Sequence, residues 1–215
     1  GGLLLVNCAR MWWFSIGRDP RLRIPVSAYV RRFFLLPFHF FSQDRYRQCE
    51  KKRPWAIHLI LMLSYLTMLI LIMFFLHRVQ SGPAIEWRVH VFGYLATAGL
   101  LGTTAFALYG RARKTETHYK HSHESDWIFL VLLAYVAGTG ILQHGLHRAG
   151  LDAAANLTYI AHMMGAVPML GLEVPFSKWA HLAYRPLAMY FSALQEEAME
   201  VRARASGETA PLRAA

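Results

Sequence analysis

Cysteine is scarce in this chain of 215 residues, which contains only Cys8 and Cys49. Two cysteines cannot build a disulfide scaffold, a four-cysteine zinc site or a cysteine-ligated iron–sulfur cluster held by this chain alone. Charged residues are also few, at 17% of the sequence, against roughly 25% in an average soluble domain. Hydrophobic residues make up 55%, and that content excludes an intrinsically disordered chain.

Acidic residues are fewer than basic ones, with 13 Asp and Glu against 23 Lys and Arg, so the net charge is +10. None of the basic residues lies in four apolar runs, 55–76, 89–109, 127–146 and 157–176. Each run has about 20 residues, and a helix of that length crosses a hydrocarbon core of roughly 30 Å. The helices of a soluble bundle would carry a polar face, which these runs lack. The sequence therefore predicts an all-α integral membrane bundle with four complete transmembrane helices.

The first 14 residues are apolar as well, but Asn7 and Arg10 interrupt them. They lack the basic start and the small-residue cleavage site of a signal peptide. We expect them to form a first transmembrane helix or the remnant of one. The chain then divides into the first helix (1–14), a basic amphipathic cytoplasmic segment (15–54), the four-helix membrane bundle (55–181) and a cytoplasmic tail (182–215).

The distribution of basic residues predicts the orientation of the bundle. Residues 1–54, 110–126 and 177–215 together carry 20 of the 23 Lys and Arg, and the connections 77–88 and 147–158 share the other three. Loops rich in Lys and Arg stay in the cytoplasm. We therefore expect the N-terminal segment and the C-terminus to be cytoplasmic, in an integral protein of the cytoplasmic membrane.

Basic residues alternate with aromatic clusters in the 15–54 segment, as in YVRRFFLLPFHFF. One interpretation is an amphipathic segment that lies on an anionic leaflet of membrane lipid. The other is a docking platform for a cytoplasmic partner. The composition also fits nucleic-acid binding, but the membrane anchor argues against a nucleic-acid partner.

Histidine is the chemically active residue that stands out, with 11 copies, several of them in or beside the apolar runs. An ionisable residue inside a membrane is a functional hypothesis by default. Neutral imidazole ligates haem iron, and a helical bundle can hold a porphyrin between histidines on facing helices. Three further histidines, in the loop HYKHSHESD, match no zinc motif, and we interpret that loop as polar and solvated.

Depth in the bilayer suggests which histidines share an iron. His58 lies near the start of the first run and His181 just past the end of the last, so both come to the inner side. His162 precedes His181 by 19 residues, or roughly 28 Å along a helix. Those two cannot ligate one iron, so we expect two haems, with His58 and His181 holding the inner one. For each of these histidines, a role other than binding haem iron stays open.

The outer haem would use His162 as one ligand, and its second ligand is less certain. His144 is the preferred partner, because it lies at a matching depth on a run joined to that of His162 by a short loop. His77 is the competing partner, although it stands about 100° around the helix from His58. His90 ranks below both. Met68 could ligate through its thioether, but a packing role is favoured, and a bundle without a second haem also stays open.

One stretch carries a family resemblance. Residues 160–186 read IAHMMGAVPMLGLEVPFSKWAHLAYRP and resemble the last helix of membrane b-type cytochromes related to the nitrate reductase gamma subunit. The nearest look-alikes are the C subunit of the quinone-interacting membrane-bound oxidoreductase complex and the membrane subunit of heterodisulfide reductase. The shared pattern is His162, then the turn Pro175-Phe176-Ser177-Lys178, then His181. His58-Leu59 after a basic stretch fits too, and Met68 stands where the nitrate reductase branch has a second histidine.

The resemblance implies a dihaem b-type cytochrome subunit of a respiratory complex in a bacterial or archaeal membrane. It would pass electrons between membrane quinone and cytoplasmic iron–sulfur or flavin subunits, which would carry the soluble catalysis. Glu173 is the only acid within a run, and with Lys178 and His181 it could line an inner quinone site or proton route. An interfacial ion pair between Glu173 and Lys178 is the simpler interpretation. A membrane anchor without a redox cofactor and a small transporter are the alternative functions.

Overall fold

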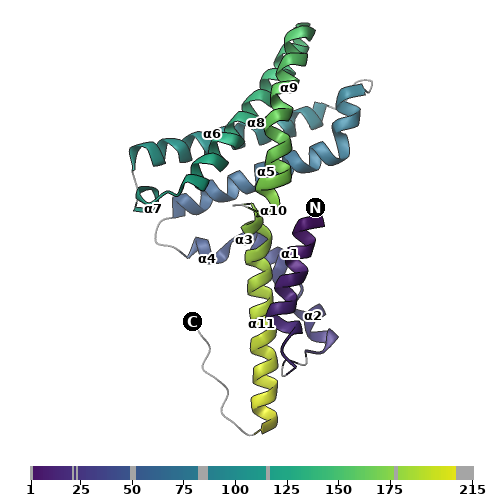
Figure 1. The fold of residues 1–215 in the computed structure, drawn as a ribbon, viewed down its shortest axis with the longest axis vertical. Helices are drawn as coiled ribbons and strands as arrows, with labels where there is room; N and C mark the ends of the chain where they lie inside the picture. The colour runs from purple at the N-terminus through teal and green to yellow at the C-terminus, as the bar shows by residue number, and fades with distance from the viewer. Residues whose placement is uncertain are drawn as a thin grey trace. The chain divides into compact units, whose positions relative to one another are not determined.

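The structure is a computed structural model, and helices are the regular secondary structure of the residues it describes. Those residues are 2–20, 22, 24–48, 52–81, 87–114, 117–176 and 179–206. The elements in Figure 1 are α1 (Gly2–Trp12), the π turn η1 (Trp13–Gly17), α2 (Val26–Arg32), α3 (Leu35–Ser42), α4 (Asp44–Arg47), α5 (Lys52–Ser81), α6 (Trp87–Arg113), α7 (Thr117–Lys120), α8 (Glu124–Arg148), α9 (Asp152–Pro168), the π turn η2 (Met169–Glu173), α10 (Val174–Phe176) and α11 (Ala180–Ser206).

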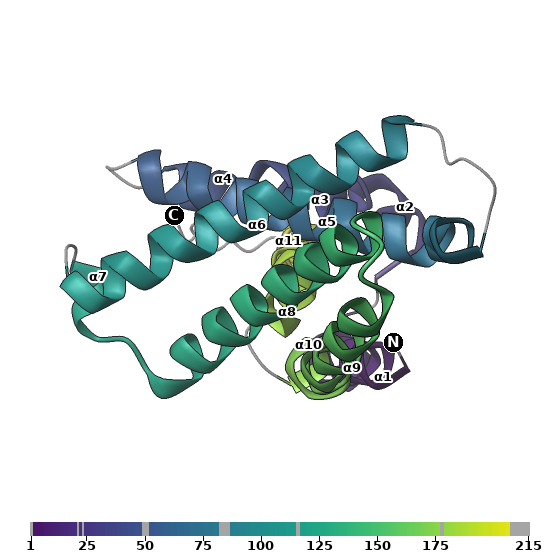
Figure 2. The same cartoon turned by 90° about the horizontal axis from the view of Figure 1, so that it is seen from above.

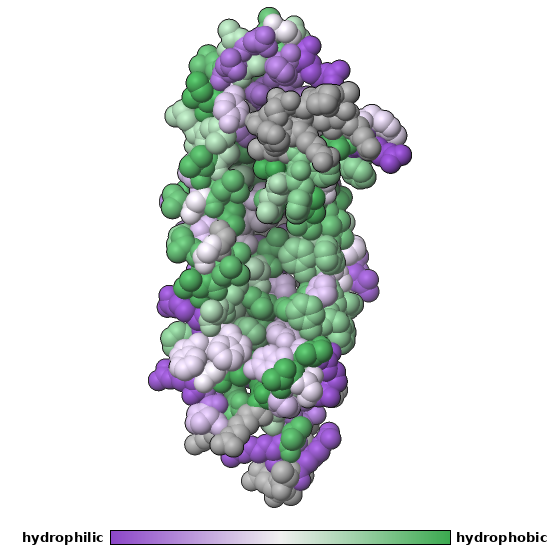
Figure 3. Space-filling model, turned by 90° about the vertical axis from the view of Figure 1, so that its right-hand side faces the viewer, coloured by the Kyte–Doolittle hydropathy of each residue, from purple (hydrophilic) through white to green (hydrophobic). Residues whose placement is uncertain are grey.

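The all-helical prediction is confirmed for the described residues, and so are four helical stretches long and apolar enough to cross a membrane. They cover Lys52–Phe75, Trp87–Arg113, Glu124–Arg148 and Asp152–Arg204. Large apolar side chains stay exposed along them; Phe74, for example, is 70% exposed. On the face drawn in Figure 3, apolar side chains form much of the surface. The α1 helix has 11 residues and is not one of the four stretches, so a first span stays a prediction.

The chain forms two compact units, which are described separately. The bundle unit is Gln48–Glu173, and the tail unit combines Gly1–Arg47 with Val174–Ala215. The boundary falls at Glu173, earlier than the residue 181 expected from the sequence. Pro168 and the π turn η2 precede it, and a proline inside a helix removes one backbone hydrogen bond and disturbs the turn before it.

The bundle unit is a succession of neighbouring helices: α5 packs on α6, α6 on α8, and α8 on α9 (Figure 2). The short α7 segment joins the ends of α6 and α8. Glycine allows the closest approach, because a Cβ atom added at Gly165 would stand 2.6 Å from the Tyr135 ring. Tyr135 also donates a hydrogen bond of 2.7 Å to the carbonyl of Ala161. The α8 and α9 helices therefore pack directly on each other at this point, with the Tyr135 side chain of α8 against the α9 backbone.

The tail unit packs the N-terminal segment against α11. Its core consists of the large side chains Ile16, Tyr190, Phe191 and Leu194 together with Ala28. The Tyr190 hydroxyl donates 2.9 Å to the carbonyl of Tyr29. The Arg32 guanidinium lies 2.9 Å from the Glu197 carboxylate, which Arg31 also contacts. The basic segment thus has a partner within the chain, and neither the lipid nor the docking interpretation is tested by this contact.

Candidate functional site

The bundle unit encloses a cavity of about 300 Å³ between α5, α6, α8 and α9. This volume is at the lower end of the range for small-molecule sites, about 300–1,000 Å³. Most of the lining is apolar, and the polar groups are few. They are Tyr65 on α5, His90, Tyr94 and Thr97 on α6, His144 on α8 and His162 on α9. Three of the histidines predicted from the sequence are therefore brought to one cavity.

His162 is held in a defined orientation. Its Nδ1 lies 3.0 Å from the carbonyl oxygen of Val136 and 3.1 Å from the Thr139 hydroxyl. A carbonyl only accepts hydrogen bonds, so Nδ1 carries the hydrogen and Nε2 keeps its lone pair. A Cβ atom added at Gly140 would stand 3.3 Å from Cε1 of the ring, so glycine leaves room for the imidazole. A backbone partner at one ring nitrogen, with the other free to bind, is the arrangement of metal-ligating histidines.

A second polar cluster lies where the first turns of α6 face the last turns of α8. The Tyr94 hydroxyl is 2.8 Å from Nε2 of His144. The ring centroids of His90 and His144 are 5.8 Å apart, and those of His90 and Tyr94 are 6.4 Å apart. In this arrangement the Nε2 atom of His144 is already hydrogen bonded. His147 lies three residues further along α8, 3.3 Å from Asp152 at the start of α9.

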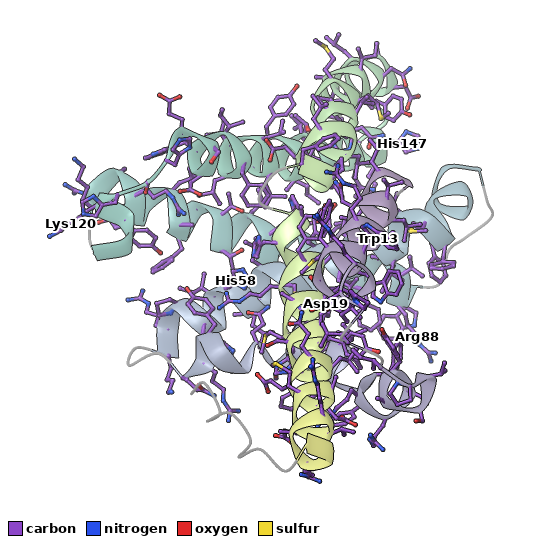
Figure 4. The ribbon with its side chains drawn as sticks, turned by 60° about the horizontal axis from the view of Figure 1, so that its bottom comes forward. Trp13, Asp19, His58, Arg88, Lys120 and His147 are labelled. Carbon is purple, nitrogen blue, oxygen red and sulfur yellow. The ribbon has the colours of Figure 1, made fainter. Side chains whose placement is uncertain are left out.

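His58 and His181 are placed in different units. His58 is half-buried on α5 in the bundle unit (Figure 4), and His181 is exposed on α11 in the tail unit. Their predicted pairing is not tested, so it stays a prediction. His77 belongs to α5, but its side chain lies outside the described residues, and Lys178 lies outside them altogether.

Glu173 ends the π turn η2 and is half-buried. Its Oε2 atom is buried and has no hydrogen-bond partner within the described part of the chain. Short π-helical turns inside α-helices are frequent at functional sites. The Oε2 atom of this carboxyl group is therefore available to bind a proton or a polar ligand.

One histidine of the histidine-rich loop, His123, has a structural role. The His123 side chain accepts a hydrogen bond from the backbone N–H of Ser125, and Asp126 accepts one from the backbone N–H of His123. This reciprocal cap begins α8. Among the described residues, no group of three or more His, Cys, Asp or Glu could hold a metal ion. A haem iron takes only axial protein ligands, so this finding does not bear on a haem.

Sequence reasoning missed the residues that orient the histidines. Val136 contributes a backbone carbonyl, which any residue type could supply, so the sequence carries no signal for it. Thr139 and Gly140 lie next to each other in the α8 run, and only their small size was a hint. Tyr94 follows His90 by four residues, and that spacing places both on one helix face.

Comparisons of the chain with models of known families, with curated proteins and with solved structures found no match.

Proposed function

We propose that this chain is a dihaem b-type cytochrome subunit of a respiratory complex. It would transfer electrons between membrane quinone and cytoplasmic iron–sulfur or flavin subunits. The observation that carries the proposal is His162, a half-buried imidazole in an apolar cavity with Nδ1 bonded to a backbone carbonyl. That geometry leaves Nε2 as the ligating atom.

The membrane setting of the proposal has separate support. Four helical stretches have the length and composition of spans. Lys120 and Arg88, labelled in Figure 4, lie toward opposite ends of the bundle unit. This is the arrangement expected if the connection with four basic residues faces the cytoplasm and the connection near Arg88 faces outward. The chain would then be integral to a bacterial or archaeal cytoplasmic membrane, with both termini inside.

The outer haem would occupy the cavity and bind His162. A bound haem supplies one-electron transfer at its iron. The chain's own groups prepare the site: the Val136 carbonyl and the Thr139 hydroxyl fix the imidazole, and the apolar lining excludes water. Glycines at positions 93 and 140 line the cavity without a side chain, which suits a flat cofactor.

The inner haem would use His58 and His181, on the depth match argued from the sequence. Glu173, with its buried and unpartnered Oε2, would serve quinone or proton transfer near it, together with Lys178. Quinone reduction and oxidation move protons as well as electrons, and a carboxyl group is one side chain that can supply and accept them.

The test is a reduced-minus-oxidised spectrum of the purified full chain, with haem quantified per chain. We expect b-type bands and two haems. His162→Ala should remove the outer haem, because no other imidazole in the cavity has its carbonyl partner, and His58→Ala should remove the inner one. His147→Ala, on the exposed side chain paired with Asp152, is the matched control and should keep both. A wild-type chain without haem would refute the proposal and leave a cofactor-free membrane anchor.

A further inference from the structure

We propose that the sulfur of Met68, and not His144, is the second axial ligand of the iron bound at His162. The inference rests on the proposed haem function and concerns the identity of one ligand. Three observations carry it: the wall of the cavity on which each candidate lies, the level of each candidate along the bundle, and the hydrogen bond that already engages His144.

The first observation concerns the walls. Axial ligands bind opposite faces of a porphyrin, so they must come from opposite walls of the site. His162 is on α9, which packs directly on α8 through Gly165 and Tyr135. The His162 ring itself lies against Gly140 of α8. No porphyrin fits between these two helices. Because His144 is also on α8, it belongs to the same wall, and the opposite ligand must come from α5 or α6.

The second observation concerns the level of α5 relative to α6. A Cβ atom added at Gly93 of α6 would stand 3.8 Å from Cδ1 of Leu71 on α5, and one added at Gly99 would meet the Ser64 side chain. Because α5 and α6 run in opposite directions, each α5 residue between these two contacts can be assigned to the α6 residue at the same level. Met68 lies between Leu71 and Ser64 and is therefore level with residues 95–96 of α6.

The same matching extends from α6 to α8. Tyr94 reaches His144, and Leu100 shares a core cluster with Leu133. Residue 96 of α6 is therefore level with about residue 140 of α8. Gly140 is the residue that the His162 ring touches. Met68 and His162 consequently stand at one level on opposite walls of the cavity, and both line it.

The other candidates stand at different levels. His144 is four residues further along α8 than Gly140, about 6 Å outward at 1.5 Å per residue. His77 is nine residues past Met68 on α5, roughly 13 Å further outward. His90 is six residues from Ala96 on α6, about 9 Å outward. Of the four candidates, Met68 is therefore the one whose level is nearest to that of His162.

The third observation is chemical. The Nε2 atom of His144 is engaged by the Tyr94 hydroxyl at 2.8 Å, so its lone pair or its hydrogen is already in use. Met68 is half-buried and packs beside Leu100, Leu133 and Met169. A thioether needs no deprotonation to bind iron, and histidine–methionine ligation is an established haem type with a raised reduction potential. The outer iron would therefore be the more readily reduced of the two.

The test uses the purified full chain with its haem. Ferric haem with a methionine ligand gives a charge-transfer band in the far-red that bis-histidine haem lacks. We expect this band in the wild type and its loss in Met68→Leu, which conserves volume, together with a high-spin EPR signal. Met68→His should keep the haem, give a bis-histidine EPR signal and lower the midpoint potential. Met73→Leu, on an α5 residue 69% exposed, is the control and should change nothing.

The opposite outcome is equally specific. If Met68→Leu leaves the band pattern and both midpoint potentials unchanged while His144→Ala alters them, the ligand is His144 and this inference is wrong. In that case haem is still bound, so the proposed function stands. A wild-type chain that binds no haem overturns the proposed function as well, and the pyridine haemochrome assay separates the two failures.

Discussion

The bundle unit and the tail unit both bury large side chains, Leu133 in the first and Leu194 in the second, but they differ in their closest helix contacts. In the bundle unit the close contacts involve Gly165, Gly99 and Ser64, and two buried threonine hydroxyls bond to the backbone of their own helix, Thr97 to Gly93 at 2.8 Å and Thr103 to Gly99 at 2.6 Å. In the tail unit the core is built from large side chains such as Tyr190 and Leu194. Small residues at helix contacts are typical of association in lipid, where apolar burial gives little driving force. Burial of large apolar side chains is the driving force in water.

The comparison shows where each unit is sensitive to substitution. A unit that depends on buried volume loses stability when a side chain is removed. A unit that depends on close backbone approach loses stability when an atom is added. The described residues offer a matched change of each kind.

The largest effect is expected from Leu194→Ala in the tail unit. Leu194 is fully buried, and truncation of such a leucine costs about 2–5 kcal/mol. Hydrogen exchange should rise in α11 and α2, while the outer haem proposed at His162 stays bound; the inner haem is no readout here, because its proposed ligand His181 lies on α11. Loss of the outer haem in this variant would show that the two units do not depend on separate cores.

A smaller effect is expected from Gly165→Ala in the bundle unit. The added Cβ would stand 2.6 Å from the Tyr135 ring and 3.1 Å from Val136, and such overpacking costs about 1–3 kcal/mol. Thermal unfolding, measured by the release of haem, should shift to lower temperature. Gly138→Ala is the matched control, since nothing lies within 4 Å of its added Cβ; alanine there should be neutral or favourable, because it improves helix propensity by about 1 kcal/mol.

The N-cap of α8 gives an intermediate case. His123→Ala removes the acceptor for the Ser125 N–H, and loss of a side-chain cap costs about 1 kcal/mol. Exchange should increase in the first turn of α8 only. His121→Ala, in the same loop, changes no hydrogen bond of the cap and serves as the control. An equal change in both variants would contradict a capping role.

The smallest effect is expected from Glu197→Gln. Arg31 and Arg32 both contact this carboxylate, but the arginine side chains are 64% and 41% exposed. Exposed pairs contribute about 0.2–1 kcal/mol, and salt screens them. The wild type should therefore lose protection in α2 as salt is raised, and the variant should show little salt dependence.

The sequence predicted the four long helices because a bilayer demands long apolar runs free of charge, and composition alone reveals these. It assigned residues 182–215 to a tail and gave no core to this segment, because the stripe of Tyr190, Phe191 and Leu194 becomes a core only when the N-terminal segment packs on it. Counting residues from the helix ends placed His162 and His144 at one depth, and both side chains line one cavity. Their contacts with Gly140 and Tyr94 depend on side-chain packing, which no residue count could show, and the pairing of the two histidines at one iron stays a prediction.

The hydrogen bond from His162 to the Val136 carbonyl has a consequence for how charge moves. A carbonyl oxygen cannot take up the proton that it holds on Nδ1, whereas a carboxylate could. If His162 binds haem as proposed, the imidazole would therefore keep the same number of protons in the ferric and the ferrous state. Electron passage at that iron would be uncoupled from acid–base chemistry at its ligand, and its midpoint potential should not follow pH through His162. Protons released or consumed by quinone would have to travel by other groups, so electrons and protons would cross the bundle along separate routes.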